Sequence, residues 1–172
     1  MTIWEETKCL DLLKGQKVIE IAAEAPLAGG CETLVTNGVS SAPVFSSKTS
    51  TYVGMLDYRD IVSFVLVAFH RRQLEKVDEL EEPRLNDLVK RVVTGGAGDG
   101  EVEARMVSDL SHHNPFYSVL EASPLSTAID ILGKNGVHRM NVLGDDGKVK
   151  GVLSQTDIVR FLIKHVLLSF LI

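Results

Sequence analysis

The sequence predicts an α/β (α+β) fold built from two copies of one β-α-β-β-α unit, and two observations predict it. The chain resembles itself: a shift of 98 positions lays Asn37-Gly38-Val39 on Asn135-Gly136-Val137, and a shift of 97 lays Asp60-Ile61-Val62 on Asp157-Ile158-Val159. Both copies also alternate apolar residues at helical spacing with short apolar runs typical of strands. Internal duplication of one supersecondary unit is therefore the best explanation of the sequence.

Each copy is expected to contain the same five elements in the same order. A leading strand precedes an amphipathic helix, and an Asn-Gly pair ends that helix because glycine readily adopts the left-handed conformation that closes it. A hairpin follows, with Asp145-Asp146-Gly147 as a strong turn signal in the second copy. The expected strands are residues 18–22, 42–45 and 52–56, then 116–121, 140–143 and 149–153, and the last helices are residues 58–72 and 155–168.

The predicted domain organisation has three parts. Residues 1–75 hold the first repeat with an N-terminal segment, residues 76–108 a charged and glycine-rich linker, and residues 109–172 the second repeat with a C-terminal helix. A unit of roughly 50 residues buries too little surface to be stable alone, so the two copies are expected to pack together. The apolar end, residues 161–172, is shorter than the ~20 residues of a membrane span and is expected to pack on protein.

Composition excludes several classes of function. The chain of 172 residues is 45% apolar and 24% charged, which is ordinary for a globular protein, and its net charge of −5 argues against nucleic acid as a partner. Cys9 and Cys31 match no metal-ligand spacing and are too few for a disulfide framework, so reduced thiols and a cytoplasmic location are expected, with no membrane as a partner. The adjacent pair His112-His113 offers no metal site, and residues 95–100 lack the lysine of a phosphate-binding loop.

The strongest local signal is residues 151–157, Gly-Val-Leu-Ser-Gln-Thr-Asp, where a strand is expected to end and a helix to begin. Ser154 can cap that helix, and Asp157 three residues later completes a pattern like a capping box. The same carboxylate suits two vicinal ribose hydroxyls, while the hydroxyls of Ser154 and Thr156 and the helix amides suit phosphate. Both interpretations are compatible with the sequence.

The second signal is the basic pair His138-Arg139, just before a strand of the same repeat. Such a pair is often only solvated surface. The corresponding residues of the first repeat are Ser40-Ser41, so the basic pair is specific to one copy. An arginine can hold phosphate oxygens in bidentate fashion and a histidine can add a second donor, which favours a phosphate site.

These motifs resemble the tandem CBS-domain family, also called the Bateman module, and nearly the whole chain outside the linker resembles half of the gamma regulatory subunit of AMP-activated protein kinase. The resemblance implies two CBS repeats related by pseudo-twofold symmetry, with adenine-nucleotide sites for AMP, ADP or ATP in the clefts between them. It implies that Asp60 and Asp157 contact ribose, that Ser154 and Thr156 contact ribose or phosphate, and that His138 and Arg139 contact phosphate.

The sequence departs from the family pattern in the first repeat. Asp57 stands where the family usually has threonine or serine, so a second carboxylate enters this site and is expected to repel phosphate. Arg59, aligned with Thr156, is expected to offset part of that charge. The gamma subunits carry four repeats where this chain has two, so it is either a half-length relative or a fragment of a longer protein.

Two functions follow from this resemblance. The first is a regulatory module without catalysis, cofactor or metal, whose adenine nucleotide changes how it binds a protein kinase or another regulated enzyme. The alternative is a CBS module for interaction or assembly that binds no ligand, while an enzyme would need a catalytic domain that the sequence does not show. The apolar helices over residues 61–69 and 158–168 are expected to be half exposed, which favours a homodimer or a second CBS pair as partner.

Overall fold

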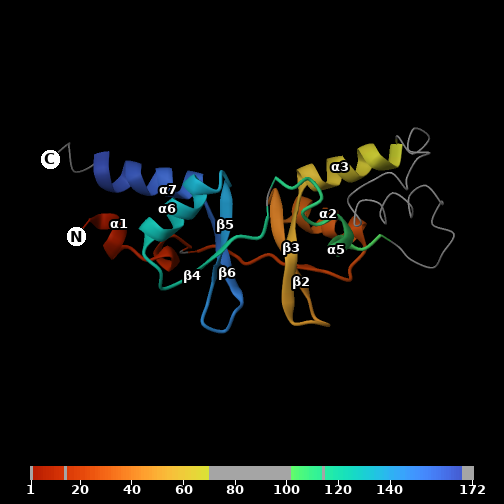
Figure 1. The fold of residues 1–172 in the computed structure, drawn as a ribbon, viewed down its shortest axis with the longest axis horizontal. Coiled ribbons are helices and arrows are strands. Elements are labelled where there is room, and N and C mark those ends of the chain that lie inside the picture. The colour runs from red at the N-terminus through yellow and green to blue at the C-terminus, as the bar shows by residue number, and fades with distance from the viewer. Residues whose placement is uncertain (1, 14, 70–101, 114, 168–172) are drawn as a thin grey trace. The chain divides into compact units, whose positions relative to one another are not determined.

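The computed structural model describes residues 2–13, 15–69, 102–113 and 115–167 (Figure 1). The described residues contain two three-stranded sheets in the orders β1-β2-β3 and β4-β5-β6. The chain divides into two compact units: residues 19–115, here called the first-repeat unit, and residues 1–18 with 116–172, here called the second-repeat unit. The mixed α+β fold expected from the sequence is therefore confirmed.

In the first-repeat unit, β1 runs parallel to β2, and β2 is antiparallel to β3. The expected strand, helix, hairpin and helix follow one another in that order, and a short helix from beyond residue 101 joins them. The elements are β1 (Ile21–Ala22), α2 (Leu27–Thr36), β2 (Ser41–Ser46), β3 (Thr51–Asp57), α3 (Tyr58–Phe69) and α5 (Ala104–Val107).

The second-repeat unit has the same pattern, with β4 parallel to β5 and β5 antiparallel to β6. Its elements are β4 (Ser118–Leu120), α6 (Leu125–Lys134), β5 (Arg139–Leu143), β6 (Val149–Ser154), α7 (Gln155–Leu162) and the π-helical continuation η4 (Ile163–Leu167). Two N-terminal elements belong to the same unit: α1 (Ile3–Glu6) and the 3₁₀-helix η1 (Cys9–Leu13).

The strand register confirms the duplication residue by residue. Val44 pairs with Gly54 in the first hairpin and Val142 with Gly151 in the second, and the register shifts directly after both valines. Gly38 and Gly136 each have a φ of +63°, which is the left-handed conformation expected after the first helix of each copy.

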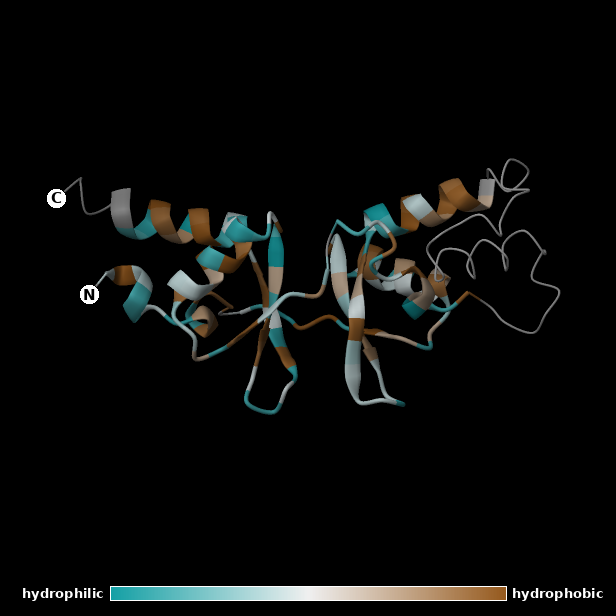
Figure 2. Ribbon diagram, viewed as in Figure 1, coloured by the Kyte–Doolittle hydropathy of each residue, from teal (hydrophilic) through white to brown (hydrophobic). Residues whose placement is uncertain are grey.

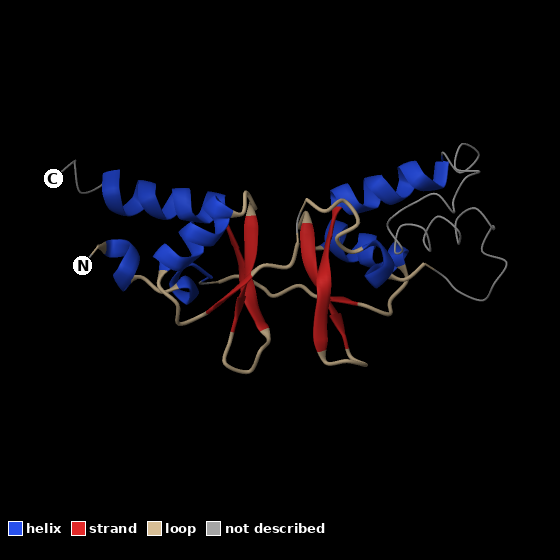
Figure 3. Ribbon diagram, in the orientation of Figure 1, coloured by secondary structure: helices blue, strands red, loops and turns tan. Residues whose placement is uncertain are grey.

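Each unit has its own hydrophobic core, in which the two helices of the repeat cover one face of its sheet (Figure 3). Leu34 of α2 packs with Val44 and Leu56 of the first hairpin, and all three side chains are buried. Leu125, Met140 and Leu153 are among the corresponding buried residues of the second unit. Apolar residues of the expected helices and strands thus form the core of each unit.

The segment that precedes each repeat in the sequence packs on the other repeat. The Leu125 amide donates to the Thr7 carbonyl (2.8 Å), so residues around Thr7 lie on the second repeat. The Leu27 amide donates to the Val102 carbonyl (2.8 Å) in the same way, so the segment after residue 101 lies on the first repeat. The two antiparallel bridges, Lys8 to Pro124 and Pro26 to Glu103, repeat this equivalence.

This exchange differs from the domain boundaries expected from the sequence. The N-terminal residues 2–18 pack with the second repeat rather than with residues 19–75, and residues 102–108, expected to be linker, form α5 against the first repeat. The remainder of the expected linker, residues 76–101, lies outside the described residues. The physical reason is that buried apolar residues of both segments, Cys9 and Leu13 in one and Ala104 and Val107 in the other, complete the core of the repeat they cover.

Gly151 permits the close approach of the N-terminal segment to β6. A Cβ at Gly151 would lie 2.8 Å from Oε1 of Gln16 and 2.9 Å from Cδ1 of Leu13. The Gln16 side chain also binds the backbone of Val152 twice, donating to its carbonyl (2.9 Å) and accepting from its amide (3.0 Å). The Gln16 side chain therefore forms hydrogen bonds with the backbone at the outer edge of β6.

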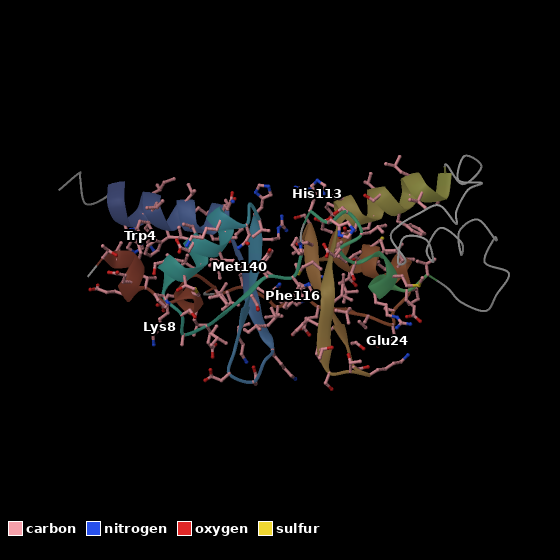
Figure 4. The ribbon with its side chains drawn as sticks, viewed as in Figure 1. Trp4, Lys8, Glu24, His113, Phe116 and Met140 are labelled. Atoms are coloured by element: carbon pink, nitrogen blue, oxygen red, sulfur yellow. The ribbon has the colours of Figure 1, made fainter. Side chains whose placement is uncertain are left out.

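The apolar C-terminal helix packs on the N-terminal helix, as its composition predicts. Trp4, labelled in Figure 4, contacts Phe161 of α7 with 5.9 Å between ring centroids, and Phe161 stacks on His165 at 4.3 Å. Within the described ranges, no helix has both the length and the apolar character needed to cross a membrane. Cys9 and Cys31 are free thiols, and burial raises the pKa of the Cys9 thiol to about 11.

Candidate functional site

The hairpin of the second repeat brings the predicted site residues together. Arg139 is the first residue of β5 and Ser154 the last of β6, and the two are direct partners in the antiparallel register. Residues opposite each other in such a pair have Cβ atoms about 5 Å apart. The basic pair therefore lies beside the start of α7, which carries Thr156 and Asp157 in its first turn. We call His138, Arg139, Ser154, Thr156 and Asp157 the second-repeat site.

Ser154 and Asp157 form the capping box that the sequence predicts. The Ser154 hydroxyl accepts from the Asp157 amide (3.2 Å), and the Ser154 amide donates to Oδ2 of Asp157 (2.9 Å). The serine hydroxyl also donates to Oδ2 (2.6 Å). Oδ1 is turned elsewhere and forms a long ion pair with Nη1 of Arg160, at 3.6 Å. One carboxylate oxygen thus stabilises the helix start, while the other is available to a ligand.

Gln155 orients the histidine of this site. Its backbone amide donates to the His138 carbonyl (3.0 Å), its side-chain amide donates to the Val137 carbonyl (3.1 Å), and its Oε1 lies 3.4 Å from Nδ1 of His138. Gln155 is not among the site residues predicted from the sequence, although its position between Ser154 and Thr156 is a signal that it lies within the site.

The second-repeat site is open to solvent. His138 and Thr156 are exposed, Arg139 and Ser154 are half-buried, and the Asp157 side chain keeps 23% of its surface exposed. Its polar groups comprise two basic side chains, two hydroxyls and one carboxylate beside the positive end of α7. Such a set can bind an anion and hydrogen-bonding hydroxyls at the same time.

In the first repeat, Asp57 takes the structural position of Ser154. It pairs with Ser41 at the end of the hairpin, and its Oδ1 accepts from the amides of Arg59 (2.7 Å) and Asp60 (3.0 Å). The Asp57 amide donates to Oδ2 of Asp60 (2.9 Å), which is the same reciprocal bond as in the second repeat. The Asp57 carboxylate, 8% exposed, therefore caps α3 in place of a hydroxyl.

Asp60 is enclosed in a way that Asp157 is not. It is 0% exposed, and its Oδ1 accepts from the Ser111 amide (2.9 Å) while Oδ2 accepts from Asp57. Burial raises the pKa of the Asp60 carboxyl, and the neighbouring Asp57 carboxylate adds to that rise. Both Asp60 oxygens are thus engaged within the protein. Ser111, which the sequence analysis missed, lies 51 residues away and carries no local signal of this contact.

Arg59 lies in a separate environment on the outer side of α3. It is exposed and lines a pocket of about 350 Å³ together with Tyr58, Val62, Ser63, Ser111 and His113. Figure 4 labels His113 beside the start of α3. The structure therefore brings Asp57 and Asp60 together, but it directs their carboxylates to backbone amides and leaves Arg59 on the surface. Within the described residues, no cluster of histidine, cysteine or acidic side chains could hold a metal ion.

The comparisons with known proteins match one part of the chain to a family and the chain as a whole to a fold. The model of the CBS domain family matches residues 107–164. A CBS domain protein from Pyrobaculum aerophilum complexed with AMP is similar to this chain, with a TM-score of 0.59 and 18% identity over 88% of this chain and 89% of that one. A protein from Methanocaldococcus jannaschii, proposed as an archaeal homologue of g-AMPK, has a TM-score of 0.64 and 14% identity over 92% of this chain and 50% of that one. Residues 107–164 therefore form a CBS domain, and the chain has the fold of CBS-domain proteins.

Curated proteins similar to this chain include yeast proteins named SDS23. The one from Candida albicans is 26% identical over 171 residues, and the one from Meyerozyma guilliermondii is 30% identical over 171 residues, each over 92% of this chain. The chain spans only 27% and 32% of the length of these two relatives. The comparisons indicate no catalytic family.

Proposed function

We propose that this chain is a regulatory module without catalysis that binds an adenine nucleotide, AMP, ADP or ATP, at its second-repeat site. One observation carries the proposal: the hairpin register places Arg139 beside Ser154 at the start of α7, where Oδ1 of Asp157 forms only a long ion pair with Arg160. The AMP complex of the Pyrobaculum aerophilum protein, which shares the fold, supports the choice of ligand.

The chemistry of the site matches the two ends of such a ligand. The acceptor-only carboxylate of Asp157 suits the vicinal hydroxyls of ribose, because each hydroxyl brings one donor. The Arg139 guanidinium, the His138 imidazole, the Thr156 hydroxyl and the first amides of α7 suit phosphate oxygens. A ligand hydroxyl at Oδ1 of Asp157 would replace an exposed ion pair that contributes little stability, so binding loses little there.

The first repeat favours the alternative function at its own site. Asp60 is buried with both oxygens engaged, and Asp57 is directed into the backbone of α3. Opening Asp60 to a ribose would break its bond to Ser111 and leave the half-buried Ser111 amide without that acceptor. This site therefore stabilises the fold and binds no ligand, as the alternative supposes, and we propose one nucleotide per chain.

Exposed apolar residues on the outer helices support a protein partner. Val62 and Leu66 of α3 are 56% and 54% exposed, and Val159 and Ile163 of the C-terminal helix are 50% and 53% exposed. Both helices carry hydrophobic stretches along their ribbons (Figure 2). An apolar stripe of this kind is commonly covered by another protein surface. We propose that a second copy or another CBS pair covers it, and that nucleotide binding alters the contact with a regulated enzyme such as a protein kinase. The two free thiols fit a reducing compartment, the cytoplasm.

Titration calorimetry with AMP, ADP, ATP, S-adenosylmethionine and NAD tests the proposal. We expect an adenine nucleotide to bind with a stoichiometry of one per chain. Replacing the arginine, Arg139→Gln, should weaken that binding, whereas Lys148→Gln, a matched loss of charge in the exposed β5–β6 turn, should not. Absence of binding by all five compounds would reject the nucleotide site and leave the assembly function.

A further inference from the structure

Gln155 joins the start of α7 to the loop that carries His138 through three contacts. Its backbone amide donates to the His138 carbonyl (3.0 Å), and its side-chain amide donates to the Val137 carbonyl (3.1 Å). The other polar atom of that side chain, Oε1, lies 3.4 Å from Nδ1 of His138. The backbone bond thus fixes the position of Gln155, and the bond to Val137 fixes the orientation of its amide.

The orientation of this amide decides which ring nitrogen of His138 carries a hydrogen. Turning the amide over would place Oε1 against the Val137 carbonyl oxygen, and two acceptors repel each other. Oε1 therefore faces Nδ1, and because an amide oxygen only accepts, Nδ1 is the nitrogen that donates. Nε2 is left to a ligand, since the His138 ring has no other hydrogen-bond or ion-pair partner among the residues that the structure describes.

A neutral His138 of this form presents a lone pair at Nε2. The oxygens of a phosphate dianion are acceptors as well, so the two groups repel each other unless a proton lies between them. An imidazolium ring supplies that proton from Nε2 and gains a charge-assisted hydrogen bond. Phosphate and His138 can therefore form a bond only when the pair holds one proton at this place.

Charged groups around His138 do not provide this proton. Those on the adjoining elements, at the end of α6, the start of β5 and the first turns of α7, are Lys134, Arg139, Asp157 and Arg160. Lys134 and Asp157 are paired within their own helices, and the described contact of the His138 ring is to the uncharged Gln155. Free imidazole and free phosphate monoesters both lose a proton between about pH 6 and pH 7, so above that range the proton must come from solvent.

We propose that Gln155 is a positioning residue that makes phosphate binding at the second-repeat site take up one proton, which the pair of His138 and phosphate then shares. The proposal rests on the proposed function, because it concerns the phosphate end of the same nucleotide. It adds a form of regulation: the affinity for AMP falls as pH rises above about 7, by up to about tenfold per pH unit. Adenosine, which has no phosphate, should show no such dependence.

The position of the hydrogen is tested in the free chain by nitrogen NMR of the histidine rings at about pH 8, where imidazole is neutral. We expect the hydrogen of His138 on Nδ1. Gln155→Met keeps the length of the side chain but removes both amide groups, and should release the form with hydrogen on Nε2. Gln155→Glu keeps an acceptor beside Nδ1 and should restore the first form. A neutral His138 with its hydrogen on Nε2 in the unchanged chain would overturn the proposal.

Proton uptake is measured by titration calorimetry with AMP at about pH 8 in two buffers that differ in heat of ionisation, Tris and HEPES. We expect close to one proton per AMP in the unchanged chain and close to none in His138→Gln and Gln155→Met. His113→Gln removes an exposed histidine of the first-repeat unit and should leave the uptake unchanged. Raising the pH by about one unit should weaken AMP binding by about tenfold in the unchanged chain and by much less in Gln155→Met. A general loss of structure in that variant would not produce this difference.

Two outcomes would overturn the proposal and leave the nucleotide site intact. These are AMP binding without proton uptake, and equal proton uptake in the unchanged chain and in Gln155→Met. Absence of AMP binding would instead reject the nucleotide site itself and this proposal with it, so the two failures are distinguishable.

Discussion

The two equivalent aspartates should respond differently to replacement by alanine: one variant should lose nucleotide affinity and the other should lose stability. Asp157 and Asp60 occupy the same position in the two repeats, three residues after the cap of the second helix. They differ in their surroundings, because Asp157 turns Oδ1 outward while both oxygens of Asp60 accept backbone amides. We therefore expect Asp157→Ala to impair nucleotide binding and Asp60→Ala to impair folding.

The expected magnitudes follow from the bonds each carboxylate makes. A hydrogen bond to a charged group contributes ~1.5 to 3 kcal/mol, so Asp157→Ala should weaken nucleotide binding by roughly ten- to a hundredfold. Asp60→Ala leaves the buried amide of Asp57 and the half-buried amide of Ser111 without an acceptor, at up to about 1 to 3 kcal/mol each. Relief of the buried charge offsets part of this cost, so we expect a net loss of about 2 kcal/mol in the free energy of unfolding. Loss of the exposed cap in Asp157→Ala should cost about 1 kcal/mol.

Calorimetric titration measures the affinity of both variants and urea unfolding measures their stability. Asp157→Ala should lose more affinity, and Asp60→Ala should lose more stability. Affinity should be measured well below the unfolding midpoint of each variant, so that loss of structure does not imitate loss of binding. Asp146→Ala, which removes an exposed carboxylate from the β5–β6 turn, is the matched control. Equal losses of affinity in Asp60→Ala and Asp157→Ala would refute the inequality of the sites, and a fully stable Asp60→Ala would refute the role assigned to Ser111.

Three further perturbations test the fold, the buried carboxyl and the assembly. Gly151→Ala places a Cβ 2.8 Å from Oε1 of Gln16 and should lower the free energy of unfolding, measured in urea, by about 1 to 3 kcal/mol. In the control variant Gly29→Ala on α2, the added Cβ meets no atom within 4 Å, so the free energy of unfolding should rise by about 0.5 to 1 kcal/mol. Burial raises the pKa of the Asp60 carboxyl in the folded state, so the folded chain binds this proton more tightly than the unfolded chain. The contribution of Asp60 to stability is therefore present at low pH and is lost as pH rises from 3.8 through the raised pKa. Asp60→Asn should remove that loss, and parallel profiles of stability against pH for the two proteins would contradict the prediction. Leu66→Glu on the exposed stripe should abolish self-association in sedimentation and change unfolding by less than about 0.5 kcal/mol, whereas a persisting dimer would place the interface elsewhere.

The sequence alone predicts the order of the helices and strands, the internal duplication, and the helix start that carries Ser154 and Asp157. These features depend on contacts between near neighbours in the chain, such as the cap from Ser154 to Asp157, three residues apart. Glycine at positions 38 and 136 adopts the left-handed conformation that the sequence requires there. The turn of the second hairpin is recognisable in the sequence, but the pairing of Arg139 with Ser154 is given by the register of the folded hairpin.

The sequence does not reveal which segment covers which repeat. The pairing of Gln16 with Val152 joins residues 136 positions apart, and neither residue type predicts the other. The N-terminal segment and the segment that forms α5 have little sequence similarity. They have small or apolar residues in common, such as Cys9 and Ala104, but not identical ones. The domain boundaries expected from the sequence differ for this reason.

The difference between the two aspartates is decided by tertiary structure. In sequence, Asp60 and Asp157 lie in matching motifs, and the family resemblance implies the same contact with ribose for both. The amide of Ser111, which reaches Asp60 across 51 residues, encloses one carboxylate, while the other keeps 23% of its surface exposed. Burial and hydrogen bonding depend on what the rest of the chain brings to a residue, so identical local motifs acquire different chemistry only when the chain is folded.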